Sequence, residues 1–352
     1  MVLTRRAHRE RMEISRWLPN EILVHIIQHS AKADQATLAR VSKLFHALCL
    51  PILYRVVEFK DPHSTTVFCS GIIENPSRAD AVRSFVLDVP YQYCCDMRDD
   101  LVLASLKLMS RLDHLSFSEF TFDYRHGRIL LEEINFLQLT SCNIWVPDDL
   151  IYRFPAQASD LSVRVSLPHL EFYHGGAAFV SGIDAICLKE VQLTWYSADD
   201  ANVDKIVTSL SSMTLTKPHL PFVSCHAYWG GPCHQIMDSV SMRMPHTKTL
   251  RLHPMRDYGA LLSQDTILHA TECLPQFTGL LYLAMEWSKG AFPTSGADKH
   301  KDRIAVEGWG EACPTLEACC LNHSGWRKVD GRWEEYPIKK FWALAGLCDL
   351  GY

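Results

Sequence analysis

The chain has 352 residues, which is enough for two domains or for one domain followed by an extended array. Hydrophobic residues make up 47% and charged residues 21%, as in ordinary globular proteins with material for a sizeable core. The formal net charge of -5 argues against extensive wrapping of nucleic acid, and no apolar run approaches the roughly 18 residues of a membrane span.

Residues 1–16 are rich in arginine and lack the apolar segment of a secretory signal, so we expect a basic tail. The chain contains 13 cysteines, an odd number at irregular spacing. Such cysteines are typical of reduced thiols that pack as small hydrophobes. We therefore expect the protein in the cytoplasm, the nucleus or both.

The stretch WLPNEILVHIIQHS, residues 17–30, predicts a helix from Pro19 to Ser30. Pro19 suits the first turn, and the carboxylate of Glu21 interacts favourably with the helix dipole. Apolar residues crowd onto more than one face, whereas a surface helix needs only one apolar stripe. The second face must therefore be buried against something, in this chain or in another.

A polar break is expected at residues 31–37, followed by a helix that starts with Thr37 as its N-cap and runs to about Cys49. Pro51 interrupts the pattern, and ILYRVVEF at 52–59 resumes it. Helices this short form a very small core. A unit of this size is rarely stable without a partner.

The segments LPNEILVHII at 18–27 and LARVSKLFHALCLPILYRVV at 38–57 resemble an F-box. LPILYRVVEF and the later W…CPTLE further resemble fungal F-box-like proteins. The resemblance implies a helical module over 17–60 that docks onto a Skp-family adaptor in a cullin–RING ubiquitin ligase. It carries adaptor contact over to Leu18, Pro19, Glu21, Ile22, Leu23, Ile26, Ile27, Val41, Ser42, Lys43, Phe45, Pro51, Leu53 and Tyr54. The alternative is a helical hairpin packed on the rest of its own chain.

Beyond an expected junction at 61–80, a Leu-x-x-Leu-x-Leu pattern recurs across 81–352 at an average step of about 29 residues. Its copies begin at Val82, Leu112, Ile134, Leu167 and Leu188, and more weakly near Lys217, Thr247, Phe277 and Leu316. INFLQLTSCNI, at 134–144, is the one complete copy. We predict an α/β protein: a short helical F-box followed by a leucine-rich-repeat-like α/β solenoid, with a compact α/β domain as the alternative. Irregular loops are expected at 225–235 and 286–310.

In such an array, the residue between the second and third apolar positions of each copy faces the concave side. The pattern places Val86, Ser116, Gln138, Glu171, Gln192, Arg251, Leu281 and Cys320 there, with Tyr173, Trp195, Tyr196 and His253 just beyond. Aromatic residues and arginine often anchor interfaces. We therefore predict substrate binding at Gln138, Glu171, Tyr173, Gln192, Trp195, Arg251 and His253, the alternative being ordinary solvated strand surface.

Metal and catalytic signals are weak. Cys225, His226, Cys233 and His234 lack the two-residue spacing of a zinc knuckle, and neither a Gly-x-Ser-x-Gly elbow nor a phosphate-binding loop is present. We expect no metal, no cofactor and no enzymatic activity. The predicted function is the substrate-recognition subunit of a Skp–cullin–F-box ubiquitin ligase, which binds the adaptor and an unidentified protein substrate but neither nucleic acid nor membrane. A non-catalytic scaffold and an enzyme in the C-terminal region are the alternatives.

Overall fold

The computed structural model describes residues 18–89, 99–118, 134, 136–144, 164–196, 202–214, 221–228, 233–255, 262–285, 296–322 and 324–347. The chain forms two compact units, Met1–His114 and Leu115–Tyr352, which we call unit 1 and unit 2. The expected basic tail at 1–16 lies outside the described residues. No helix in the described ranges is both long and apolar enough to cross a membrane.

Three short helices open the described part of unit 1: α2 (Asn20–Gln28), α3 (Lys32–Leu38) and α4 (Lys43–Leu53). The expected break at 31–37 is wrong, because most of it forms α3. Ser42, not Thr37, caps the next helix, and its side chain accepts a hydrogen bond from the backbone N–H of Phe45 at 3.2 Å. The buried Gln35 amide donates to the carbonyls of Ile27 (2.8 Å) and Ser30 (2.9 Å), which satisfies backbone groups at the end of α2.

The rest of unit 1 comprises β1 (Val56–Phe59), α5 (Pro62–Glu74), η1 (Pro76–Ala81), β2 (Ser84–Asp88) and α6 (Asp99–Leu106). Residues 61–80, the expected junction, therefore include α5 and η1. Asp61 caps α5 by accepting a hydrogen bond from the Ser64 N–H at 2.8 Å. β1 and β2 pair in parallel, with Val57 opposite Phe85. Aromatic contacts of Phe68 with Tyr54 and Phe59 join the end of α4 to α5 and β1.

Unit 2 contains the strands β3 (His114–Ser118, from the boundary onward), β4 (Ser141–Ile144), β5 (Val165–Ser166), β6 (Phe172–Gly176), β7 (Ile183–Asp184), β8 (Glu190–Trp195), β9 (Val223–Tyr228), β10 (Thr249–Pro254), β11 (Tyr282–Met285), β12 (Ala318–Leu321), β13 (Ser324–Val329) and β14 (Arg332–Tyr336). Its helices are η3 (Ala177–Gly182), α9 (Val203–Thr214), α10 (Cys233–Arg243), α11 (Gln264–Cys273), η5 (Leu274–Gln276), α12 (Gly296–Ala312) and α13 (Ile338–Ala345). Together with the helices of unit 1, these elements confirm the mixed α/β class.

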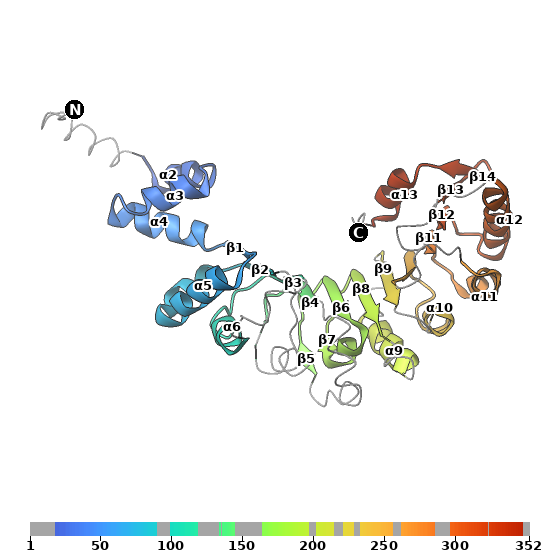
Figure 1. The fold of residues 1–352 in the computed structure, drawn as a ribbon, viewed down its shortest axis with the longest axis horizontal. Coiled ribbons are helices and arrows are strands. Elements are labelled where there is room, and N and C mark those ends of the chain that lie inside the picture. The colour runs from blue at the N-terminus through green and yellow to red at the C-terminus, as the bar shows by residue number, and fades with distance from the viewer. Residues whose placement is uncertain are drawn as a thin grey trace, which may run out of the picture. The chain divides into compact units, whose positions relative to one another are not determined.

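The main sheet of unit 2 follows the chain order β3-β4-β6-β8-β9-β10-β11-β12-β13-β14, and β5 pairs with β7 separately. From β4 to β12 the pairings are parallel, and β13 and β14 add antiparallel strands. Helices α9, α10 and α11 lie together on one face of this sheet (Figure 1). The expected loops at 225–235 and 286–310 contain regular structure instead, because they include parts of β9 and α10 and most of α12.

The strand positions correct the register of several pattern copies. In the copies that start at Val82, Leu112, Leu188, Thr247 and Leu316, the strand begins two residues after the first apolar position. β4 instead places Leu139, Cys142 and Ile144 in the three apolar positions, five residues later than predicted. β6 begins at Phe172, three residues later than its copy predicts. Both shifts occur because neighbouring apolar residues fit the same loose pattern in two registers.

The C-terminal helix α13 packs on the sheet face opposite α9–α11 (Figure 1). Phe341 and Trp342 are buried there against Ala284 of β11 and Cys320 of β12. The hydroxyl of Thr249 donates a hydrogen bond to the Ala345 carbonyl at 3.0 Å. We call this side of the unit 2 sheet the α13 face. The helix thus covers the sheet around β10–β12.

Candidate functional site

Helix α2 has two apolar faces, and only one of them is covered by described residues. Leu23 and Ile27 are buried, whereas Ile22 is 47% and Ile26 51% exposed. Ile22 and Ile26 are four residues apart, which puts them on one side of the helix, and Leu18, just before the helix, also has an exposed side chain. The apolar excess noticed in the sequence is therefore at the surface and is not needed for the core of unit 1.

Two more apolar side chains are exposed around the start of α4. Val41 is 65% exposed and Leu44 is also exposed; Leu44 was not among the predicted contact residues, although its place in the apolar pattern could have indicated it. We call Leu18, Ile22, Ile26, Val41 and Leu44 the outer apolar set. Large exposed apolar groups of this kind mark interaction surfaces in soluble proteins.

The structure divides the other predicted adaptor residues by exposure. Pro19, Glu21, Ser42, Lys43 and Pro51 are exposed, Phe45, Leu53 and Tyr54 are partly buried, and Leu23 and Ile27 are in the core. Tyr54 is occupied within unit 1, because its hydroxyl accepts a hydrogen bond from Arg78 at 3.3 Å and its ring contacts Phe68. Leu23 and Ile27 therefore support the helix from inside, and only the exposed residues are accessible to a partner.

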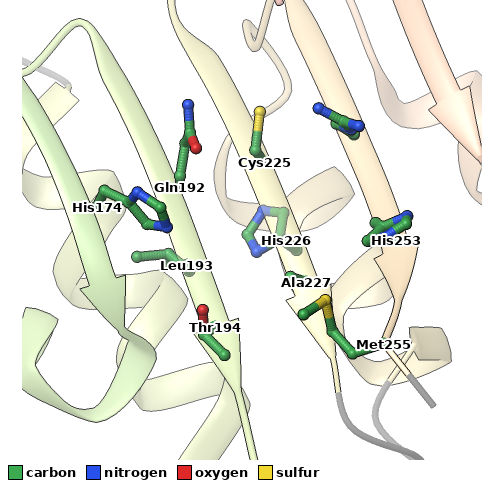
Figure 2. Close-up of a pocket in the computed structure, with 10 residues that line it drawn as sticks. His174, Gln192, Leu193, Thr194, Cys225, His226, Ala227, His253 and Met255 are labelled. Carbon is green, nitrogen blue, oxygen red and sulfur yellow. The ribbon is translucent and has the colours of Figure 1, made fainter. Parts of the chain in front are cut away.

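The parallel registers align one row of side chains on the α13 face of unit 2. It runs through Asn143, His174, Gln192, Cys225, Arg251, Ala284 and Cys320. Figure 2 shows His174, Gln192 and Cys225 beside one another on β6, β8 and β9, where the row lines a hollow that also includes Arg251 and His253. The row is mostly uncharged: burial lowers the pKa of His174, so its ring is neutral at pH 7.

Two predicted members of this row are displaced by the register shifts. Gln138 is exposed in a turn before β4, and its place in the row belongs to Asn143. Glu171 precedes β6 and forms an ion pair with Lys189 at 2.7 Å, and its place belongs to His174. Gln192 is where the pattern placed it, and its amide donates to a carboxylate oxygen of Glu190 at 2.8 Å.

Arg251 and His253 do lie on the α13 face, but both are largely covered. The Arg251 guanidinium stacks over the Trp342 ring of α13 at 4.9 Å. The same helix covers Cys320, while Leu281 falls outside the row because Ala284 takes that position on β11. Cys225 is also buried, so the accessible part of the row is Asn143, His174 and Gln192 on β4, β6 and β8.

Tyr173 and Trp195 are corrections to the predicted binding surface, because both are core residues. Tyr173 is 2% exposed, and its hydroxyl donates to the Gly176 carbonyl. Trp195 is fully buried and donates its indole N–H to Nδ1 of His226 at 3.0 Å. Side chains alternate along a strand, so these two point away from the row that contains His174 and Gln192.

Ser224 and His226 are residue types that form nucleophile–base pairs in enzymes, but the His226 nitrogen that faces Ser224 carries a proton and cannot accept one. Nε2 of His226 lies 2.8 Å from the Ser224 hydroxyl. Because the Trp195 indole can only donate, Nδ1 of His226 must accept, and in the neutral ring Nε2 then carries the proton. Burial lowers the pKa of His226 to about 3, so the ring stays neutral. It therefore donates to Ser224 and cannot act as its general base.

The cysteines and histidines considered for zinc are distributed over two elements. Cys225 and His226 are consecutive on β9, so their side chains point to opposite faces of the sheet. Cys233 and His234 follow at the start of α10, where the Cys233 thiol is buried and burial raises its pKa. His234 instead stacks on His269 of α11, with ring centroids 4.4 Å apart. The four residues do not form one site.

Comparison with known proteins bears on the N-terminal helices. Residues 17–60 match the family model described as F-box-like, and no curated protein matches the chain. The matched residues contain α2, α3, α4 and β1, and with them the whole outer apolar set. Residues 17–60 are therefore an F-box-like domain, as the resemblance of Leu-Pro-x-Glu-Ile-Leu and Val-Ser-Lys had predicted.

Proposed function

We propose that this protein is a substrate-recognition subunit of a Skp–cullin–F-box ubiquitin ligase. The observation that carries the proposal is the outward apolar face of α2 within an F-box-like domain. F-box domains typically bind Skp-type adaptors, and an adaptor groove would cover the face that Leu18, Ile22 and Ile26 present. The protein is then a non-catalytic receptor, and ubiquitin transfer takes place on other subunits of the complex.

Burial of the outer apolar set in an adaptor groove would contribute favourable free energy to binding through the hydrophobic effect. Complete burial of one large aliphatic side chain contributes roughly 1.5–3 kcal/mol. Ile22 and Ile26 are each about half exposed, so about half of that contribution is still available to a partner. Val41 is the most exposed of the set. Interfaces usually depend on a few such residues rather than on their whole area.

We further propose that unit 2 is a leucine-rich-repeat-like array and that its α13 face holds the protein substrate. Parallel pairing in chain order and helices gathered on the other face support this reading. The accessible residues of the row, Asn143, His174 and Gln192, would contribute neutral hydrogen-bonding groups. Tethering a substrate there raises its effective concentration near the transferring enzyme.

Co-expression with a Skp-family adaptor, followed by size-exclusion chromatography, tests the proposal. We expect a one-to-one complex with the intact chain and its loss in Ile22→Ala/Ile26→Ala. The matched control is Met242→Ala/Leu268→Ala, which removes two comparably exposed apolar side chains from unit 2 and should leave the complex intact. Absence of a complex with the intact chain would contradict the proposal. Complex formation without cullin-dependent substrate turnover would favour the scaffold.

A further inference from the structure

Three side chains on two neighbouring helices of unit 2 bring metal-ligating atoms together. His269 and Cys273 are four residues apart on α11 and so share one face, and Asp238 reaches them from α10. His269 Nε2 lies 3.0 Å from Asp238 Oδ1, and Cys273 Sγ lies 3.3 Å from the same oxygen. The sulfur is 3.6 Å from His269 Nε2. One imidazole nitrogen, one thiol and one carboxylate thus form a compact triangle.

The triangle has the dimensions of one face of a zinc coordination tetrahedron. With a Zn–S bond of about 2.3 Å and Zn–N and Zn–O bonds of about 2.0 Å, tetrahedral angles separate sulfur from nitrogen and from oxygen by about 3.5 Å each, and nitrogen from oxygen by about 3.3 Å. The corresponding separations in the protein are 3.6, 3.3 and 3.0 Å. Shifts of a few tenths of an ångström would seat the ion.

The surroundings suit a bound cation. Cys273 is 2% exposed, whereas the Asp238 side chain is 50% exposed, so an ion can enter from solvent and keep a water molecule as its fourth ligand. The carboxylate of Glu272 lies 3.9 Å from Nδ1 of His269, on the far side of the ring. This separation is too long for a hydrogen bond, so Glu272 adds negative charge near the ring without fixing its orientation. His234 stacks on the same ring and limits its movement.

We propose that Asp238, His269 and Cys273 form a zinc site that clips α10 to α11. A set of thiolate, imidazole and carboxylate ligands matches the preference of Zn²⁺, and the two anionic ligands neutralise its charge. In the metal-free protein, burial and the Asp238 carboxylate raise the pKa of Cys273 to about 12, so its sulfur carries a proton. Zinc binding forms the Zn–S bond, breaks the S–H bond and releases that proton to the buffer.

Cobalt(II) titration of the chelator-treated, tag-free full chain tests the site. We expect one thiolate-to-cobalt charge-transfer band with the visible bands of tetrahedral cobalt, saturating at one equivalent and disappearing when Zn²⁺ is added. Cys273→Ser should abolish the charge-transfer band, and His269→Gln and Asp238→Asn should weaken metal binding at least about 100-fold. Cys187→Ser, at a partly buried cysteine outside the cluster, is the matched control and should behave like the unaltered protein.

Two outcomes would overturn the zinc site. One is the absence of a thiolate–cobalt band in the unaltered chain, and the other is an undiminished band in Cys273→Ser, which would place the metal on another cysteine. Asp238→Asn guards against misfolding as an explanation, because this side chain is half exposed and the change leaves its shape unaltered. A second measurement is thermal unfolding: zinc should raise the midpoint of the unaltered protein and of Cys187→Ser, and leave that of Asp238→Asn unchanged.

Discussion

Alanine substitutions of two consecutive isoleucines of α2 should have different effects, one on the stability of the helix and the other on adaptor binding. Ile27 is 1% exposed and Ile26 is 51% exposed. Truncation to alanine removes about three methylene equivalents, or roughly 2.4 kcal/mol of transfer free energy when the side chain is fully buried. Ile27→Ala adds a cavity to this loss, so we expect α2 to be destabilised by about 2–5 kcal/mol.

Ile26→Ala loses about half of the transfer free energy, and the higher helix propensity of alanine returns about 0.4 kcal/mol, so its cost to stability should stay below about 1 kcal/mol. The other half of the side chain is what an adaptor would cover. Its loss, roughly 1.2 kcal/mol, corresponds to adaptor binding about eight-fold weaker. Hydrogen exchange of the α2 amides reports local stability, and calorimetric titration with the adaptor reports affinity. Equal loss of protection in the two variants, or unchanged affinity in Ile26→Ala, would refute the two-face reasoning.

Two further predictions concern the packing of unit 2. In α12, an alanine at Gly308 meets open space and should stabilise the protein by about 0.5–1 kcal/mol, whereas at Gly310 its methyl group would press on the Trp333 ring and cost about 1–3 kcal/mol. Urea unfolding measures the free energy of unfolding of both variants. A Gly310→Ala variant as stable as the unaltered protein would contradict the packing of β14 on α12. The second prediction rests on the lowered pKa of His226, about 3 in the folded protein against about 6.5 in the unfolded chain. Below pH 6.5 the unfolded chain binds a proton that the folded protein does not. The free energy of unfolding therefore decreases as the pH is lowered, by about 2 kcal/mol at pH 5. His226→Gln should remove this part of the difference between unfolding at pH 7 and at pH 5, and an unchanged difference would show that another group causes it.

The F-box-like domain could be predicted from sequence because its evidence is local. α2 begins at Asn20, one residue after the predicted start at Pro19, and its apolar residues exceed what one helix face can hold. What the sequence could not assign was which face stays outside. Ile22 and Leu23 are adjacent and similar in chemistry, yet only packing against α4 distinguishes the exposed residue from the buried one.

The register of the unit 2 strands shows where pattern reasoning fails. Ile134, Leu137 and Leu139 satisfy the apolar pattern, and so do Leu139, Cys142 and Ile144. The choice between them depends on pairing with β6, a contact across about 30 residues that no local window contains. A shift of five residues moves the predicted row position from Asn143 on β4 to Gln138 in the turn before it.

The metal-ligating cluster was missed for a different reason. The cysteines and histidines at 225–234 are close together in sequence, whereas residues on one helix face are four apart, as His269 and Cys273 are. Asp238 could not be added from sequence, because it joins the pair only through the packing of α10 against α11. A search for donor pairs at helical spacing would have found two of the three ligands.

Helices α2 and α13 show why burial, and not apolar content, identifies a docking surface. Both carry large apolar side chains at close spacing. In α13, Phe341 is fully buried and Trp342 nearly so, because the helix lies on its own sheet and Trp342 also stacks with Arg251. In α2, Ile26 stays half exposed although covering it would be favourable by more than a kilocalorie per mole, roughly the figure for half an isoleucine side chain. Exposed apolar side chains also occur on the helices of unit 2, so the open face of α2 gains its meaning from its place in the F-box-like domain. The F-box-like match at residues 17–60 indicates the kind of partner that would cover it.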